Sequence, residues 1–526
     1  MAAAPTDSTI APRSASLSSP SLQGPWSNRT FRLATKALVT ALGVFTIWRY
    51  AWMSDDALIT LRTSLNWAHG YGPVFNPDER VAGYTHPLWM ALLTLMGAVS
   101  GSWIVGTLIT SVILAGIALG ILVFRSRNLW QLVTTASFVL LSNTLVNWGT
   151  SGLEGPLAIA LLSGLFVLQS RDGEVRHPLL SGFVLSLLLL CRMDYLLLLA
   201  PWLLWATKQT WIHPVRTIRL WTGLTLPLAA WALISWQYYG FILPSTFEAK
   251  TNSSIAHQEL VGRGLDYLRL SFGFDPAVLV VLVGVSVLGL AYRERPAILW
   301  TLGSAAYLGY VVWIGGDYML GRFLLVPTFA ILLATTQTSI PYTRKVSRAK
   351  HRLAYVVPLV ACALSLPSAL LFVGREGSPD LSQQFSPIVD ERFLWIRFGR
   401  GLDPFGLVDL EQGVIPTDLA FLEAQANAWP SGPWPTAEPM VRCGGLGAVG
   451  FLVPGSHIID SCGLTDRFMA SRRYEPQTGS GPWKAGHFER PVPSGYLEAV
   501  KANDPSLVQD SELARELMEL WTKIRP

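Results

Sequence analysis

Long apolar runs recur along the chain and are separated by short polar segments. The first run, at 35–53, contains no Asp or Glu. Its start is marked by the basic residues Arg29, Arg32 and Lys36. About 20 apolar residues form a helix that crosses a bilayer, so this run predicts a membrane-spanning helix that starts in the cytoplasm. Similar runs follow at 103–124, 129–148, 156–169, 179–191, 195–207, 220–239, 277–292, 297–314, 323–337 and 353–373.

The polar segments between these runs form two alternating groups. One group carries clustered basic residues: Arg125 and Arg127; Arg171 and Arg176; Lys208, Arg216 and Arg219; Arg293 and Arg295; Arg344, Lys345, Arg348, Lys350 and Arg352. By the positive-inside rule these segments face the cytoplasm. The other group faces outward and carries Asp55 and Asp56, Glu154, Arg192 with Asp194, Glu248 with Lys250, and Asp317 with Arg322.

The pattern therefore predicts a polytopic α-helical membrane protein with about 11 transmembrane helices in the inner (cytoplasmic) membrane. Residues 1–32 are expected to form a disordered cytoplasmic tail, and 33–373 the transmembrane domain. Within it, 54–102 forms a long external loop. Residues 374–526 are polar, hold no run long enough to cross a bilayer, and are expected to fold as a separate extracytoplasmic mixed α/β domain.

Composition agrees with a membrane protein and excludes several classes. Hydrophobic residues make up 51% of the chain and charged residues 14%, whereas a soluble globular protein has about 25% charged residues. The basic residues behind the net charge of +5 are spread over short segments rather than one face, so no nucleic-acid partner is expected. The expected partner is the lipid bilayer. Cys443 and Cys462 lie in the oxidising compartment, where a disulfide between them is left open.

The external loop 54–102 holds the most informative polar motif. Apolar residues at helical spacing follow the acidic pair, so Asp55 and Asp56 are expected to cap a short helix along the membrane surface. An Asp at a helix start is often structural, because it accepts backbone N–H groups and complements the helix dipole. Two acids, followed by a Gly-Tyr-Gly turn and a Gly-Tyr-Thr-His-Pro turn, favour a functional site.

Such a carboxylate suits the transfer of a sugar to a hydroxyl. A general base that removes the hydroxyl proton accelerates a reaction by about 10² to 10⁴. The second carboxylate could orient the acceptor, hold a divalent cation or raise the pKa of its neighbour. Two adjacent carboxylates alone provide too few oxygen ligands for a hard cation, so no cofactor is predicted and a divalent cation stays open.

Several strings in this chain resemble a known family. They lie at 55–62 (Asp-Asp-Ala-Leu-Ile-Thr-Leu-Arg), 66–77, 79–89, 315–319, 322–327, 463–466 and 486–487. Together they resemble polyprenyl-phosphate-sugar-dependent type C glycosyltransferases, and most closely the terminal arabinofuranosyltransferases of the mycobacterial cell wall. The resemblance implies a catalytic Asp on the first external loop, a sugar donor carried on an isoprenoid phosphate, and basic residues at outer helix ends that bind this phosphate.

The candidate site residues follow from the motif and the resemblance together. Asp55 is the first choice of catalytic base, and Asp56 the second. Arg322, Arg192 and Lys250 are the candidates for binding the donor phosphate, since a lipid phosphate needs cations at membrane depth. The candidates for other substrate contacts are His86, Tyr84, Glu154, Asp194 and Asp317. The structural alternative is a set of arginines held by salt bridges near the membrane surface and a histidine in a turn.

The predicted function is transfer of a sugar, with arabinofuranose the first choice, from a polyprenyl-phosphate donor to a cell-envelope glycan outside the membrane. A secondary transporter is one alternative, but it would show two matching halves with a midplane site, and no internal repeat is evident. A non-catalytic envelope or motor-assembly protein on the same scaffold is the other, because fold does not determine function.

Overall fold

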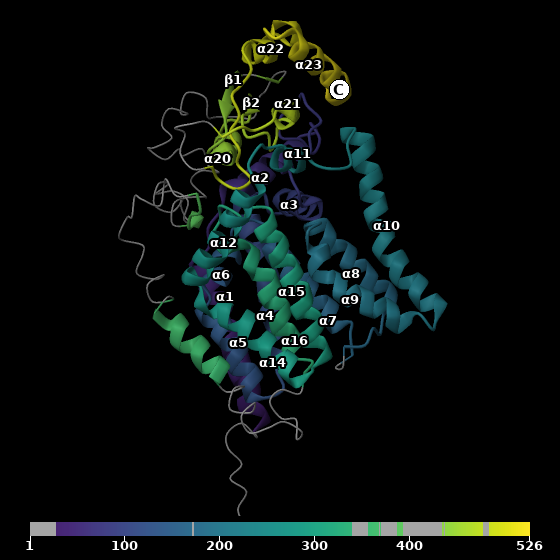
Figure 1. Ribbon diagram of the computed structural model, residues 1–526, viewed down its shortest axis with the longest axis vertical. Helices are drawn as coiled ribbons and strands as arrows, with labels where there is room; N and C mark the ends of the chain where they lie inside the picture. Colours follow the sequence, from purple (N-terminus) through teal and green to yellow (C-terminus); the bar gives the residue numbers. More distant parts are fainter. Residues whose placement is uncertain are drawn as a thin grey trace, which may run out of the picture.

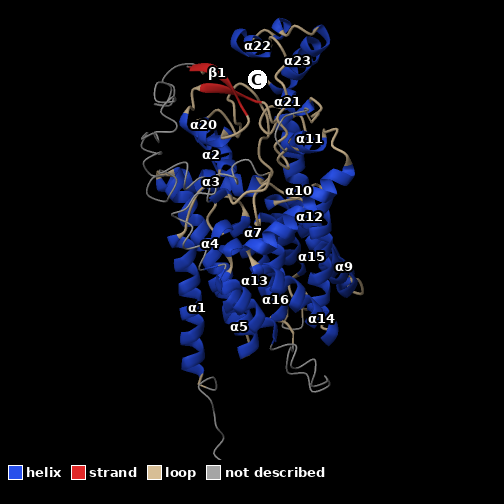
Figure 2. Cartoon of the chain, turned by 60° about the vertical axis from the view of Figure 1, so that its left-hand side comes forward, coloured by secondary structure: helices blue, strands red, loops and turns tan. Residues whose placement is uncertain are grey.

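The computed structural model describes residues 28–170, 173–338, 356–367, 369, 387–392, 434–435, 437–476 and 483–525. The predicted N-terminal tail 1–32 lies almost wholly outside the described residues, as do the basic residues between 344 and 352. Within the described part, helices stand side by side in a bundle, and the C-terminal residues from 437 onward lie across one end of it (Figures 1 and 2).

Three helices among the described residues are long and apolar enough to cross a bilayer: α1 (Arg29–Arg49), α4 (Trp103–Arg125) and α10 (Pro214–Tyr239). A fourth crossing results if α12 (His257–Phe274) and the helical segment Pro276–Tyr292, which meet at a bend of 109°, form one broken span. The protein is therefore a helical membrane protein, whereas the count of about 11 spans stays a prediction.

Shorter helices coincide with most of the other predicted runs. They are α5 (Leu129–Leu141), α6 (Asn143–Trp148), α7 (Gly155–Val167), α8 (Pro178–Cys191), α9 (Tyr195–Thr210), α15 (Arg295–Trp313), α16 (Leu325–Thr335) and Val356–Pro367. The loop 54–102 also contains an apolar helix that the sequence analysis does not predict, α3 (Pro87–Ser100), which packs against α4. Their lengths alone do not decide which of these helices cross the bilayer.

The predicted run 129–148 is two helices rather than one, and they meet at Ser142. Ser142 Oγ accepts a hydrogen bond from Leu145 N (3.1 Å) and donates one to Asp275 Oδ2 (2.6 Å). The same carboxylate oxygen accepts a bond from Thr144 N (2.8 Å). A serine side chain that satisfies the start of a new helix, and is fixed there by a buried acid, interrupts the helix ladder at this point. The prediction of one continuous helix is therefore wrong here.

The short helix predicted after the acidic pair is confirmed as α2 (Asp55–Ala68). Its cap is Ser54, whose Oγ accepts a hydrogen bond from Ala57 N (3.3 Å). The prediction that the acids themselves cap the helix is therefore wrong, since Asp55 and Asp56 form its first turn. Carboxylates in a first turn complement the positive end of the helix dipole.

The described tail residues form a small sheet and several helices. The parallel strands β1 (Ala437–Arg442) and β2 (Ser456–Asp460) are joined through α20 (Leu446–Leu452). Three further helices follow: α21 (Arg467–Ser471), α22 (Tyr496–Ala502) and α23 (Ser511–Ile524). A disulfide joins Cys443 to Cys462, which answers the question that the sequence left open. The predicted boundary at 373–374 lies outside the described residues.

The tail is attached to the loop 54–102 through a buried arginine of α2. Arg62 is 1% exposed, and its guanidinium donates to Phe75 O (2.8 Å) within the loop. It also donates to Gly450 O (2.8 Å) and Ser456 O (2.7 Å) in the tail. Because a buried guanidinium is costly unless it is hydrogen-bonded, these carbonyls and the arginine stabilise one another. The tail and the loop 54–102 are thus packed as one structure.

Candidate functional site

A cavity of about 260 Å³ lies where the bundle, the external loop and the tail meet. Nine of the ten residues predicted for the site line it: Asp56, Tyr84, His86, Glu154, Arg192, Asp194, Lys250, Asp317 and Arg322. The start of α2 and the short helix α11 (Ser245–Thr251) supply part of the wall, and tail residues Gly486 and Phe488 supply another part. Residues far apart in the sequence therefore converge on one cavity.

Asp56 is the second residue of α2, and its carboxylate faces the cavity. Arg322 Nη1 lies 3.5 Å from Oδ2, and His487 Nε2 lies 3.7 Å from Oδ1. Burial alone would raise the pKa of this carboxyl, but His487, Arg322 and Lys250 outweigh burial and hold the pKa well below its usual range. Oδ1 is buried, and no described residue donates a hydrogen bond to it. Asp56 is therefore ionised, with one oxygen that a ligand hydroxyl would satisfy.

Asp55 faces the tail rather than the cavity. Its carboxylate accepts hydrogen bonds from Ala448 N (2.8 Å) and Gly447 N (3.1 Å), at the start of α20. A Cβ at Gly447 would lie 1.9 Å from the backbone oxygen of Asp55, so the two helices can approach only at a glycine. This geometry does not support the choice of Asp55 as the base. Its role is to attach the tail to α2.

The burial of Asp55 predicts a pH-dependent stability. Burial raises the pKa of this carboxyl from 3.8 to about 6, although the backbone N–H groups of Ala448 and Gly447 act in the opposite direction. A raised pKa favours the folded protein at low pH. The contribution is complete below about pH 4 and is lost as the pH rises through 6, and it amounts to about 3 kcal/mol.

We therefore expect Asp55→Asn to change how the melting temperature depends on pH. The wild type should gain stability relative to the variant as the pH falls from 7 to 4, because only the wild type takes up this proton. Thermal unfolding of both purified proteins in the same detergent across this range measures the difference. A difference between the two melting temperatures that stays constant with pH would contradict the assignment.

Arg192 is held by two carboxylates on the cavity wall. Its Nη2 lies 2.7 Å from Asp194 Oδ2, and its Nη1 lies 3.1 Å from Glu154 Oε1. Glu154 Oε2 also lies 3.4 Å from His86 Nδ1, while His86 Nε2 is 2.9 Å from Thr60 Oγ1. This buried network fixes Arg192 and His86 in position and neutralises much of the arginine's charge.

Arg322 belongs to a second network on the same wall. Its Nε lies 2.7 Å from Asp317 Oδ2, and its Nη1 faces Asp56. The guanidinium carbons of Arg322 and Arg192 lie 5.0 Å and 4.8 Å from the ring centroid of Phe323. Phe323 thus packs with both arginines, and the electron-rich ring face stabilises two like charges in one wall.

Lys250 differs from both arginines. It lies on α11, and its side chain has no hydrogen bond or ion pair with any described residue. Burial and the positive charge of Arg322 lower the pKa of Lys250. Its Cε would be 3.0 Å from a Cβ placed at Gly486, a tail glycine with φ +79°, so the tail leaves room for this lysine. Lys250 is the cation of the cavity whose three N–H donors remain for a ligand.

Tyr84 lines the cavity, but its hydroxyl is already used. It lies 2.7 Å from the hydroxyl of Tyr239, which donates in turn to Pro73 O (2.8 Å). This chain of bonds leaves Tyr84 O–H to donate to Tyr239. Its ring rather than its hydroxyl therefore faces a ligand.

His487 is a site residue that reasoning from the sequence did not select. The pair Gly486-His487 belongs to one of the strings that carry the family resemblance. His487 is about 430 positions from Asp56 in the sequence, and no sequence rule predicts the contact between them. The His487 ring also packs edge-on against Tyr318, with centroids 4.5 Å apart. Within the part of the chain that the structure describes, no group of three or more His, Cys, Asp or Glu residues could hold a metal ion.

The fold and the cavity define a helical membrane protein whose polar site lies at one end of the bundle, under the tail. The sequence is similar to that of a protein of Corynebacterium glutamicum named terminal β-(1→2)-arabinofuranosyltransferase, with 29% identity over 441 residues. A protein of the same name from Mycobacterium tuberculosis is 29% identical over 334 residues. The resemblance predicted from the motifs is thus confirmed.

The two alignments cover 74% and 54% of this chain. They cover 61% and 52% of the relatives, so the chain spans less than two thirds of the length of the curated proteins it matches. A crystal structure of an oligosaccharyltransferase from Archaeoglobus fulgidus superimposes with a TM-score of 0.40 and 11% identity, over 83% of this chain and 65% of that one. No protein-family model matches the chain.

Proposed function

We propose that the protein is a membrane glycosyltransferase of the type C class that transfers arabinofuranose from a polyprenyl-phosphate donor to a cell-envelope glycan. The reaction takes place on the external face of the cytoplasmic membrane. The observation that carries the proposal is that the Asp56 carboxylate, with Arg322 and His487 beside it, shares the cavity with Lys250 and Arg192. We choose arabinofuranose as the transferred sugar because the chain is similar to two proteins named arabinofuranosyltransferases.

Asp56 is the general base in this proposal. An acceptor hydroxyl donates its hydrogen bond to Asp56 and attacks the anomeric carbon of the donor sugar. As the new carbon–oxygen bond forms, the bond from that carbon to the phosphate oxygen breaks, polyprenyl phosphate leaves, and the proton passes to Asp56. Arg322 and His487 hold the carboxylate in place, which keeps it ionised before the reaction.

Lys250 is the main group for the donor phosphate. The leaving phosphate gains negative charge as the glycosidic bond breaks, and a cation placed there stabilises that charge. Arg192 and Arg322 each have carboxylate partners that offset much of their charge, so Lys250 supplies the direct hydrogen bonds to the phosphate. The apolar part of the lining, including Trp231, Ile242 and Phe247, suits the first isoprene units of the carrier.

We expect Lys250→Gln to weaken donor binding about tenfold or more, because it removes a charge-assisted contact to phosphate. The change should appear as a higher KM for the donor, whereas Lys250→Arg should recover part of the affinity. Lys523→Gln removes an exposed lysine of α23 and provides the matched control. Steady-state kinetics at varied donor concentration measures all three, and an unchanged donor KM in Lys250→Gln would exclude the assigned contact.

The proposed function is tested directly with purified protein, polyprenyl-phosphate arabinofuranose and an arabinan oligosaccharide. Mass spectrometry of the oligosaccharide should detect addition of one pentose and release of polyprenyl phosphate. A non-catalytic protein on the same scaffold would bind the donor without turning it over, and a transporter would move a ligand without extending the acceptor. Absence of turnover by folded wild-type protein with this and other pentosyl donors would overturn the proposal.

A further inference from the structure

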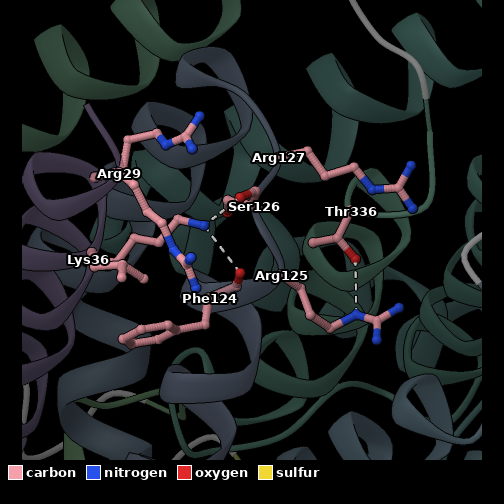
Figure 3. A pocket seen from close by; sticks show the side chains of 9 residues that line it. Arg29, Lys36, Phe124, Arg125, Ser126, Arg127 and Thr336 are labelled. Atoms are coloured by element: carbon pink, nitrogen blue, oxygen red, sulfur yellow. Dashed lines mark hydrogen bonds between the residues drawn. The ribbon is translucent and has the colours of Figure 1, made fainter. Parts of the chain in front are cut away.

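A second cavity, of about 460 Å³, lies at the N-terminal end of α1. Its wall is formed by the first two turns of α1, by the end of α4 and by Thr336, which follows α16 (Figure 3). Five basic residues line it: Arg29, Arg32, Lys36, Arg125 and Arg127. The 21 residues of α1 span about 30 Å and lead from this cavity to the loop that carries Asp56. The two cavities therefore lie at opposite ends of the bundle.

Among the described residues, none that lines this cavity is acidic. The sequences of α1, α4, α5 and α16 contain no Asp or Glu. Five cations gathered in one cavity repel one another, so the arrangement favours a bound anion. The ordinary topology signal requires only that basic residues lie on the cytoplasmic side, not that they converge on a cavity.

Lys36 and Arg125 are fixed by contacts within the protein. Lys36 Nζ donates to Phe124 O (3.0 Å) and Ser126 O (2.6 Å), and so satisfies carbonyls at the C-terminal end of α4 (Figure 3). Arg125 Nε donates to Thr336 Oγ1 (3.4 Å), which links α4 to the end of α16. These contacts join α1, the end of α4 and the end of α16 around the cavity.

The side chains of Arg29 and Arg32 make no hydrogen bond or ion pair with any described residue. They lie about one turn apart on the same helix and can both reach one ligand. Guanidinium groups bind phosphate oxygens in pairs of parallel hydrogen bonds, which makes arginine well suited to phosphate recognition. The chemistry of the cavity is therefore that of a site for a phosphate-bearing anion.

The apolar part of the wall indicates a lipid rather than a soluble phosphate. Leu33 and Phe124 line the cavity beside the cations, and they are 45% and 47% exposed. An acyl chain lying against this surface would leave its headgroup at the cations, and basic pockets between helix ends on the cytoplasmic side suit anionic headgroups.

We propose that this cavity binds the phosphate headgroup of an anionic phospholipid of the cytoplasmic leaflet, with Arg29 and Arg32 as the main contacts. The bound lipid joins α1, α4 and the end of α16 at the side of the membrane opposite the candidate active site. The site does not depend on sugar transfer, so it stands or falls separately from the proposed function.

The test is a lipid titration of full-length protein in detergent, followed by native mass spectrometry. Wild type is compared with Arg29→Gln/Arg32→Gln and with Arg219→Gln/Arg295→Gln, which removes two exposed arginines from other segments predicted to be cytoplasmic. Phosphatidylglycerol, phosphatidylcholine and millimolar inorganic phosphate are the probes. We expect saturable binding of phosphatidylglycerol to wild type, weakened about tenfold or more in the first variant and unchanged in the control.

Retention of binding in Arg29→Lys/Arg32→Lys would support recognition of the headgroup charge. Equal losses in the two glutamine variants would indicate diffuse surface charge and overturn the proposal. Equal binding of phosphatidylcholine and phosphatidylglycerol would also overturn it. If inorganic phosphate binds saturably and phosphatidylglycerol does not, the ligand is a soluble anion and the lipid assignment is wrong.

Discussion

Replacing Asp56 with asparagine is expected to lower kcat for sugar transfer by about 10² to 10⁴, with little change in the KM of the donor. The amide has nearly the same shape as the carboxylate and can stay beside Arg322, but it cannot accept the proton of the acceptor hydroxyl. The measurement is single-turnover kinetics with saturating donor and acceptor, which separates the chemical step from binding and release.

Asp55→Asn is the matched control, because it makes the same chemical change one residue earlier. Its main expected effect is on the contact with Gly447 and Ala448, and thus on stability rather than on kcat. If Asp55→Asn abolished turnover in a stably folded protein while Asp56→Asn retained it, the assignment of the base would be reversed. Similar activity of both variants and the wild type would exclude base catalysis by either residue.

The largest effect on stability is expected from Arg62→Gln. The change leaves the carbonyls of Phe75, Gly450 and Ser456 buried without their donor, and each such loss costs about 1 to 3 kcal/mol. We expect the free energy of unfolding to fall by about 3 kcal/mol or more, and the tail to become accessible to protease before the bundle does. Thermal unfolding and limited proteolysis in detergent measure the two effects.

Arg515→Gln tests whether the effect is specific. Arg515 is exposed on α23, so its loss should change stability by less than about 0.5 kcal/mol. A tail that resists protease equally in Arg62→Gln and Arg515→Gln would show that the buried guanidinium does not hold the tail to the loop. Earlier cleavage within residues 437–525 of Arg62→Gln alone would support that role.

The helices were predictable where hydrophobicity alone decides them. The start of α4 at Trp103 coincides with the prediction, because a long apolar run bounded by polar residues has one favourable state in a bilayer. The break at Ser142 was not predictable, since it depends on Asp275, which lies more than 130 positions away. The apolar sequence around Ser142 does not indicate that Asp275 will accept a hydrogen bond from its side chain.

The members of the candidate site were predictable, but their orientations were not. Acids and bases among the helices of a membrane protein are few, so collecting them recovered the charged residues of the cavity wall. Asp55 and Asp56 carry the same group at adjacent positions, and only their contacts with distant residues distinguish them: Gly447 and Ala448 donate to Asp55, whereas Arg322 and His487 lie beside Asp56. Lys250 and Arg192 likewise looked equivalent until the carboxylates beside Arg192 were located.

The contact between Asp55 and α20 has a consequence for dividing the protein into parts. Successive side chains of a helix point about 100° apart. The side chain of Asp55, which binds the tail, and that of Asp56, which faces the cavity, are therefore only one residue apart. A truncated protein that ends before α20 would expose two unpaired carboxylate oxygens in the same helical turn as Asp56. Chimeras with related proteins should therefore exchange α2 and α20 together.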